Sequence, residues 1–119
     1  MTPQELKSRT KTFAVDVIKL ARTLEANDIA TAHIVRQVVR SGTAVGANYR
    51  GSCRAKSTAD FISKMTTVEE EGDETAYWLE VLVEANLVAQ ERVAMLLNEV
   101  DQLIRIVVAS IKTARGRKR

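Results

Sequence analysis

Apolar residues recur along this chain with the three- and four-residue spacing of amphipathic helices, in four separate segments. When successive side chains are turned by about 100°, each segment gathers its apolar residues on one face. The four faces are Leu6, Phe13, Val17, Leu20 and Leu24; Ile34, Val38, Val45 and Tyr49; Phe61, Met65, Val68, Leu79, Leu82 and Val83; and Val93, Leu97, Val100, Ile104, Val107 and Ile111. The pattern predicts helices over about 4–26, 29–53, 58–86 and 90–114, the third being the longest.

The segments between these helices are short and carry helix-capping residues. Asn27 and Asp28 supply a break and an N-cap, and Ser57 followed by Asp60 is close to a capping box. With one Pro and five Gly in 119 residues, the chain has too few turn residues for a many-stranded β fold and room for one domain. We therefore expect an all-α fold: one antiparallel, up-down four-helix bundle over residues 1–114 and a basic tail over 115–119.

Composition indicates the cellular compartment in which we expect this bundle. No apolar run approaches the ~20 residues that a membrane-spanning helix needs, and the N-terminus lacks the apolar stretch of a signal peptide. The single cysteine, Cys53, excludes an internal disulfide, so we expect a cytoplasmic protein. Cys53 is expected on the buried flank of the second helix, about five turns from the only histidine, His33, which leaves it without a neighbouring base.

Two glycines in the second helix indicate close helix packing. Gly42 and Gly46 are four residues apart beside the apolar face, where each costs ~1 kcal/mol of helix propensity relative to Ala. The alternative, a phosphate-binding loop, lacks both a preceding strand and the Gly-x-x-x-x-Gly-Lys-Ser/Thr pattern. We expect these glycines to admit a neighbouring helix.

Apolar residues outside the main faces indicate self-association. The most prominent group is on the third helix, where we expect a subunit interface formed by Tyr77, Trp78 and Val81. The alternative is that these residues belong to the ordinary scatter of exposed apolar side chains. We favour a homo-oligomer.

The net charge of +3 hides an acidic block between two basic ones. Residues 29–58 carry five basic side chains and no acid, residues 59–91 carry nine acids and only Lys64, and residues 105–119 carry six basic side chains and no acid. Such a division indicates separate basic and acidic surfaces.

The basic residues of the second helix share one side of it, and with the tail they could follow a phosphate backbone with little sequence preference. The candidate nucleic-acid-binding residues are Arg36, Arg40, Arg50, Arg54, Lys56, Arg115, Arg117, Lys118 and Arg119. Two alternatives stay open: ordinary solvation of a charged face, or pairing of these arginines with an acidic stripe on the third helix. That stripe is Glu69, Asp73, Glu80 and Glu84.

The acidic residues of the third helix are also the best candidates for a catalytic site. Glu70 to Glu74 spells Glu-Glu-x-x-Glu, half of the metal site of an all-α nucleotide pyrophosphohydrolase. Such a site also requires a Glu-x-x-Asp motif on a following helix, and this motif is missing. The residue three positions after Glu84 is Leu87, and the residue three positions before Asp101 is Asn98. The Glu-x-x-His pairs of a di-iron bundle are also missing. We expect no catalytic residues, no metal, no cofactor and no enzymatic activity.

Residues 40–82 carry a resemblance to a known family. The matching pieces are VGANYR at 45–50, CRAKS at 53–57, ADFI at 59–62, EEE at 69–71, DET at 73–75 and YWLE at 77–80. They resemble the four-helix-bundle family encoded within intervening sequences of 23S ribosomal RNA genes. The chain departs from that family at Gly51-Ser52, where Glu-Ala is usual, and at Gly72, where Ala is usual.

The resemblance implies a homopentamer of four-helix bundles and no known catalytic activity. It also implies kinship with the accessory protein of diversity-generating retroelements, a basic pentamer that engages a reverse transcriptase and nucleic acid. Our leading hypothesis is therefore a non-enzymatic oligomer that binds RNA or DNA through repeated basic residues. The alternative is an interaction or scaffold subunit, such as a reverse-transcriptase accessory partner, that binds protein and no nucleic acid.

Overall fold

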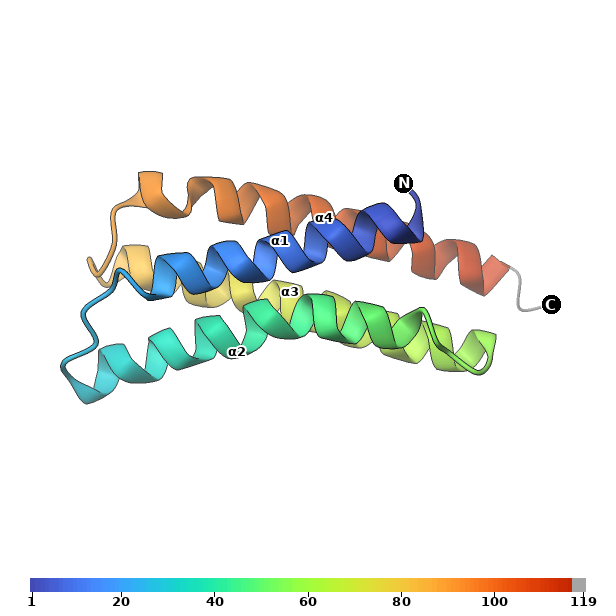
Figure 1. The fold of residues 1–119 in the computed structure, drawn as a ribbon, viewed down its shortest axis with the longest axis horizontal. Helices are drawn as coiled ribbons and strands as arrows, with labels where there is room; N and C mark the ends of the chain where they lie inside the picture. Colours follow the sequence, from blue (N-terminus) through green and yellow to red (C-terminus); the bar gives the residue numbers. More distant parts are fainter. Residues whose placement is uncertain (117–119) are drawn as a thin grey trace.

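Four helices fill a computed structural model that describes residues 1–116 (Figure 1). They are α1 (Pro3–Ala21), α2 (Ile29–Ser52), α3 (Thr58–Glu84) and α4 (Gln90–Gly116). Successive helices run in opposite directions, so α1, α2, α3 and α4 lie side by side in an elongated bundle of 52 × 24 × 21 Å. The expected all-α four-helix fold is confirmed, while Arg117, Lys118 and Arg119 of the predicted basic tail lie outside the described residues.

The core lies where the four predicted apolar faces meet. Phe13 and Val17 of α1, Val45 of α2, Leu79 of α3 and Val100 of α4 are all nearly inaccessible to solvent. At about 25 cal/mol for each Å² of apolar surface removed from water, burial of these faces is the main stabilising term of the fold. The structure thus confirms the predicted buried side of each helix in outline. On α4, Leu96 and Leu103 are buried, whereas Leu97 and Ile104 of the predicted face are only half-buried.

The first helix ends at Ala21, five residues before the predicted end at 26. Arg22 still donates its backbone N–H to the carbonyl of Ile18, but Thr23 and Leu24 donate to carbonyls only three residues earlier. The last turn therefore tightens and the helix stops. Leu24 packs against the core from this turn, which explains why its apolar character extended the predicted helix.

The third helix ends at Glu84 in a Schellman motif. Asn86 adopts a left-handed conformation with φ of 60°, and its N–H donates to the carbonyl of Val83. The N–H of Leu87 donates to the carbonyl of Leu82 at 2.9 Å. Asn tolerates this conformation better than most residues, so position 86 terminates the helix.

The fourth helix has 27 residues, as many as α3, so the prediction that the third helix is the longest was wrong. Ile111 and Ala114 stay buried near its end and keep the last turns packed against the bundle. Arg115, which was assigned to the tail, therefore lies in the last turn of this helix.

Glycines bring α2 and α1 close together, as predicted. A Cβ added at Gly42 would lie 2.9 Å from both Cγ atoms of Val17, and one added at Gly46 would lie 3.1 Å from Oγ1 of Thr10 and 3.2 Å from its carbonyl oxygen. A methyl group at either position would force its neighbour on α1 to shift. The α1–α2 contact is fixed by these two positions.

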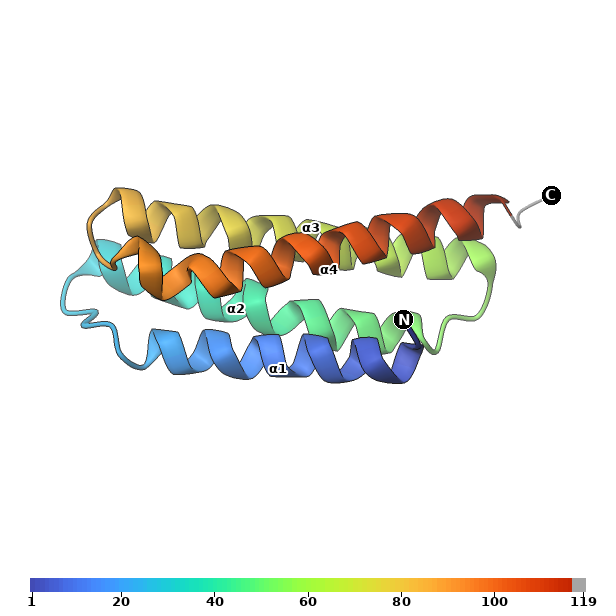
Figure 2. The same cartoon turned by 90° about the horizontal axis from the view of Figure 1, so that it is seen from above.

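The helices do not pack equally around the bundle. The α1–α4 pair makes the sparsest contact of the four neighbouring pairs. Figure 2 shows α4 diverging from α1 toward the end where the N-terminus lies. The bundle is therefore closed along α1–α2, α2–α3 and α3–α4 and more open along its fourth side.

Candidate nucleic-acid interface

The predicted arginine stripe on α2 is divided by an ion pair at its middle. Arg40 Nη2 lies 2.5 Å from Glu74 Oε2 and 3.2 Å from Glu71 Oε1, both on α3. Glu74 also accepts a hydrogen bond of 3.2 Å from Trp78 Nε1. The hydrogen bond from Arg40 holds the pKa of the Glu74 carboxyl below its usual value. Arg40 therefore joins α2 to α3.

Among the predicted binding residues within 1–116, Arg40 alone pairs with α3 carboxylates, and its partners differ from the predicted ones. Helix α3 presents Glu71 and Glu74 to α2, whereas Asp73, Glu80 and Glu84 of the predicted stripe are exposed. In residues 1–116, no salt bridge forms at the other predicted sites of the second helix and the following loop. These are Arg36, Arg50, Arg54 and Lys56. Their side chains are exposed.

Two lysines that the sequence analysis did not single out lie beside Arg50. Lys7 and Lys11 of α1 line, with Arg50 of α2, a groove of about 360 Å³. Gln4 and Ser8 complete its lining. The i, i+4 spacing of the two lysines is visible in the sequence, but their proximity to Arg50 depends on how α1 packs against α2.

Charge is separated along the length of the bundle. The N-terminus, the α2–α3 connection and the last turn of α4 lie at one end (Figure 1), which we call the terminal end. When each helix is divided at its middle residue, the half nearer this end (1–12, 41–71 and 103–116) holds ten basic and five acidic residues. The other half holds five basic and ten acidic residues. Arg50, Arg54, Lys56 and Arg115 lie in the basic half, whereas Arg36 and Arg40 lie in the acidic half.

The predicted interface residues on α3 point in different directions. Tyr77 is 56% exposed, and the exposed acids Asp73, Glu80 and Glu84 lie on the same outward side of the helix. Trp78 and Val81 are half-buried. The Trp78 ring meets His33 of α2 edge to face, with 5.7 Å between ring centroids, so it contributes to the α2–α3 contact.

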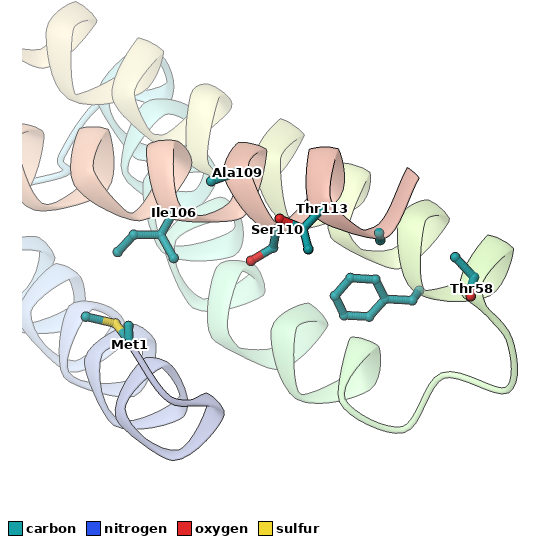
Figure 3. A pocket seen from close by; sticks show the side chains of 8 residues that line it. Met1, Thr58, Ile106, Ala109, Ser110 and Thr113 are labelled. Carbon is teal, nitrogen blue, oxygen red and sulfur yellow. The ribbon is translucent and has the colours of Figure 1, made fainter. Parts of the chain in front are cut away.

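A partly apolar groove opens where α1 and α4 diverge. It has a volume of about 530 Å³ and is lined from α3 by Thr58 and Phe61 and from α4 by Ile106 and Ser110. Figure 3 shows Ile106 and Ser110 projecting from α4 toward the side where Met1 lies. Nearby, Cys53 caps α2 and is exposed, so the expectation that it is buried was wrong. It follows the last helical residue, where the buried face no longer continues.

Two further properties concern the described residues as a group. None of their helices is long and apolar enough to cross a membrane. Nor does any cluster of three or more His, Cys, Asp or Glu side chains among residues 1–116 have the arrangement of a metal site. The carboxylates of Glu71 and Glu74 face Arg40 instead.

Comparisons with known proteins converge on one family. A family model described as 23S rRNA-intervening sequence protein matches residues 4–109. A crystal structure from Bacteroides thetaiotaomicron, described as a protein with unknown function from the S23 ribosomal protein family, is similar at 32% sequence identity and a TM-score of 0.85. That match covers 94% of this chain and 99% of the other. Among curated proteins, none matches.

Proposed function

This chain belongs to the family of 23S rRNA-intervening sequence proteins, and we propose that it is a non-enzymatic, oligomeric bundle whose terminal end binds the phosphate backbone of RNA or DNA. The observation that carries this proposal is the charge separation along the bundle. Twice as many basic as acidic residues lie in the terminal half, and four of the predicted binding residues are exposed there. Those four are Arg50, Arg54, Lys56 and Arg115.

Such an end suits backbone binding better than base recognition. Arg and Lys bind phosphates, and the release of counterions makes the affinity depend steeply on salt. Stacking of bases requires exposed aromatic rings, but Tyr49, which lies one residue before Arg50, is buried. We therefore propose that binding has weak sequence preference. The proposed nucleic-acid interface includes only the part of the α2 arginine stripe that lies at the terminal end.

Assembly would multiply this charge. In a cyclic homo-oligomer, such as the pentamer that the family resemblance implies, every copy would present its basic end on the same side of the ring if the bundles stand along the ring axis. One polyanion would then contact several copies, and its affinity would rise through the raised local concentration of sites. Tyr77, on the outward side of α3, is the residue that we assign to the subunit interface.

Fluorescence anisotropy with a labelled single-stranded RNA tests this proposal at several salt concentrations between about 50 and 200 mM. We expect affinity to fall steeply with salt for the unchanged protein. Replacing Arg54, Lys56 and Arg115 together by Ala should reduce the slope of log K against log salt by about 2 to 3.

The matched control changes the opposite end of α1. Lys19→Ala with Arg22→Ala removes exposed cations from the other half of the bundle and should leave the slope nearly unchanged. An equal loss of slope in both variants would show that binding follows overall charge and not the terminal end. Absence of binding at 50 mM salt would refute nucleic-acid binding altogether.

A second candidate function is protein interaction through the outward side of α3. The exposed Tyr77 among acidic residues favours it, because Tyr anchors interfaces and acids select basic partners. Sedimentation velocity of Tyr77→Ala separates the outcomes. Dissociation of the assembly assigns this surface to self-association, and an unchanged assembly leaves it available to another protein.

A further inference from the structure

The groove between α1 and α2 has the composition of an anion site. Lys7 and Lys11 from one helix and Arg50 from the other line it, together with Gln4 and Ser8. Gln4, Lys7, Ser8 and Lys11 follow the i, i+3, i+4, i+7 spacing of one helix face, so the side chains of α1 approach the groove together. No acidic residue is among the groove's lining.

Nothing in the local sequence neutralises these three cations. Positions three and four residues before and after Lys7, Lys11 and Arg50 hold no acid. Glu5, the acid nearest to Lys7 along α1, accepts a hydrogen bond from the backbone N–H of Thr2 in a capping box at the helix start. In residues 1–116, none of the three cations takes part in a salt bridge. No carboxylate among residues 1–116 offsets their mutual repulsion, and an anion from outside the chain would relieve it.

We propose that this groove binds a phosphate group, with Arg50 as the bidentate donor and Lys7 and Lys11 as flanking charges. The planar guanidinium matches two phosphate oxygens, and the two ammonium groups supply further positive charge beside the anion. The Ser8 hydroxyl and the Gln4 amide can donate to the remaining oxygen. A volume of about 360 Å³ accommodates a phosphate group with its first waters.

A second hollow extends the groove along the bundle and provides room for whatever carries the phosphate. It has about 210 Å³ and shares Lys7, Lys11 and Arg50, and its floor consists of small residues, among them Ala14, Gly46 and Ala47. The phosphate can therefore belong to a nucleic-acid strand or to a small phosphorylated molecule. The site deepens the proposed function through Arg50, which it shares with the terminal-end interface, yet it requires no polymer.

Titration of the ¹⁵N-labelled full chain with inorganic phosphate, at constant ionic strength maintained with chloride, tests the site directly. We expect saturable shifts of backbone amides in residues 4–11 and 47–51, and little change around Lys19 and Arg22. Lys11→Ala and Arg50→Ala should each weaken phosphate binding by about tenfold or more. Lys19→Ala with Arg22→Ala, the matched control, should bind phosphate as the unchanged protein does.

Shifts that stay linear with phosphate, or that are spread equally over all cationic residues, would overturn the site, because they would report only general screening. A parallel anisotropy arm with a labelled 5′-hydroxyl RNA, whose only phosphates are those of the backbone, shows whether a nucleic-acid strand also binds. Saturable phosphate binding without RNA binding would retain the site and refute the proposed function. RNA binding without saturable phosphate binding would retain the proposed function and refute this site.

Discussion

Gly46 sets the distance between α1 and α2, so Gly46→Ala tests the packing that positions the cationic groove. The added methyl would lie 3.1 Å from Oγ1 of Thr10, 3.2 Å from its carbonyl oxygen and 3.3 Å from its carbonyl carbon. Two of these three atoms belong to the backbone of α1. The α1 backbone must therefore shift by a few tenths of an ångström, because no side-chain rotation removes the contact.

Two effects of opposite sign determine the result of this substitution. Alanine in mid-helix stabilises by ~1 kcal/mol relative to Gly, and overpacking of a close contact costs ~1–3 kcal/mol. We expect a net loss of about 1 kcal/mol. Gly51 is the matched control, since a Cβ there meets nothing within 4 Å. Gly51→Ala, near the end of the same helix, should stabilise by about 0.5 kcal/mol.

Urea denaturation followed by circular dichroism measures both variants at one fixed protein concentration, because any assembly contributes to the apparent stability. The midpoint should fall for Gly46→Ala and rise for Gly51→Ala with unchanged m-values. A Gly46→Ala protein as stable as Gly51→Ala would refute the close α1–α2 contact. Gly46→Ala should also weaken phosphate binding, because the moved helix carries Lys7 and Lys11 away from Arg50.

Three further predictions concern single contacts. Arg40 lowers the pKa of the Glu74 carboxyl, so the stability that this pair contributes is complete above about pH 5 and is lost as the pH falls toward the pKa of Glu74 in the folded protein. Glu74→Gln should therefore flatten the acid side of a plot of melting temperature against pH. Asn86→Ala should destabilise by ~1–2 kcal/mol in urea, whereas Asn86→Gly should cause no loss, because the position has a φ of 60°. Ser57→Ala removes the hydroxyl that accepts from the backbone N–H of Asp60, and should cost about 1 kcal/mol by the same measurement.

The sequence was sufficient to predict what depends on one helix at a time. The buried faces around Phe13 and Val100 followed from periodicity, and the close packing at Gly46 followed from the cost of a glycine in mid-helix. The cap at Ser57 was also recognisable. Each of these features has its sequence signal within a few turns of one helix, even where, as at Gly46, the contact itself is with another helix.

The parts that could not be predicted depend on how two helices meet. The α3 carboxylates that face Arg40 are set by the rotation of α3 against α2, and the periodic pattern could not choose Glu71 and Glu74 over their exposed neighbours. In the same way, Lys7 and Arg50 line the same groove because of the axial offset between α1 and α2. A single sequence contains no direct record of such offsets.

The unequal charge of the two halves makes the bundle an electric dipole along its length. In a ring whose copies all point the same way, positive ends stand beside positive ends and negative beside negative, so neighbouring dipoles repel. Added salt screens this repulsion and tightens the ring, while the same ions loosen a bound polyanion. Ionic strength should therefore move assembly and polyanion affinity in opposite directions.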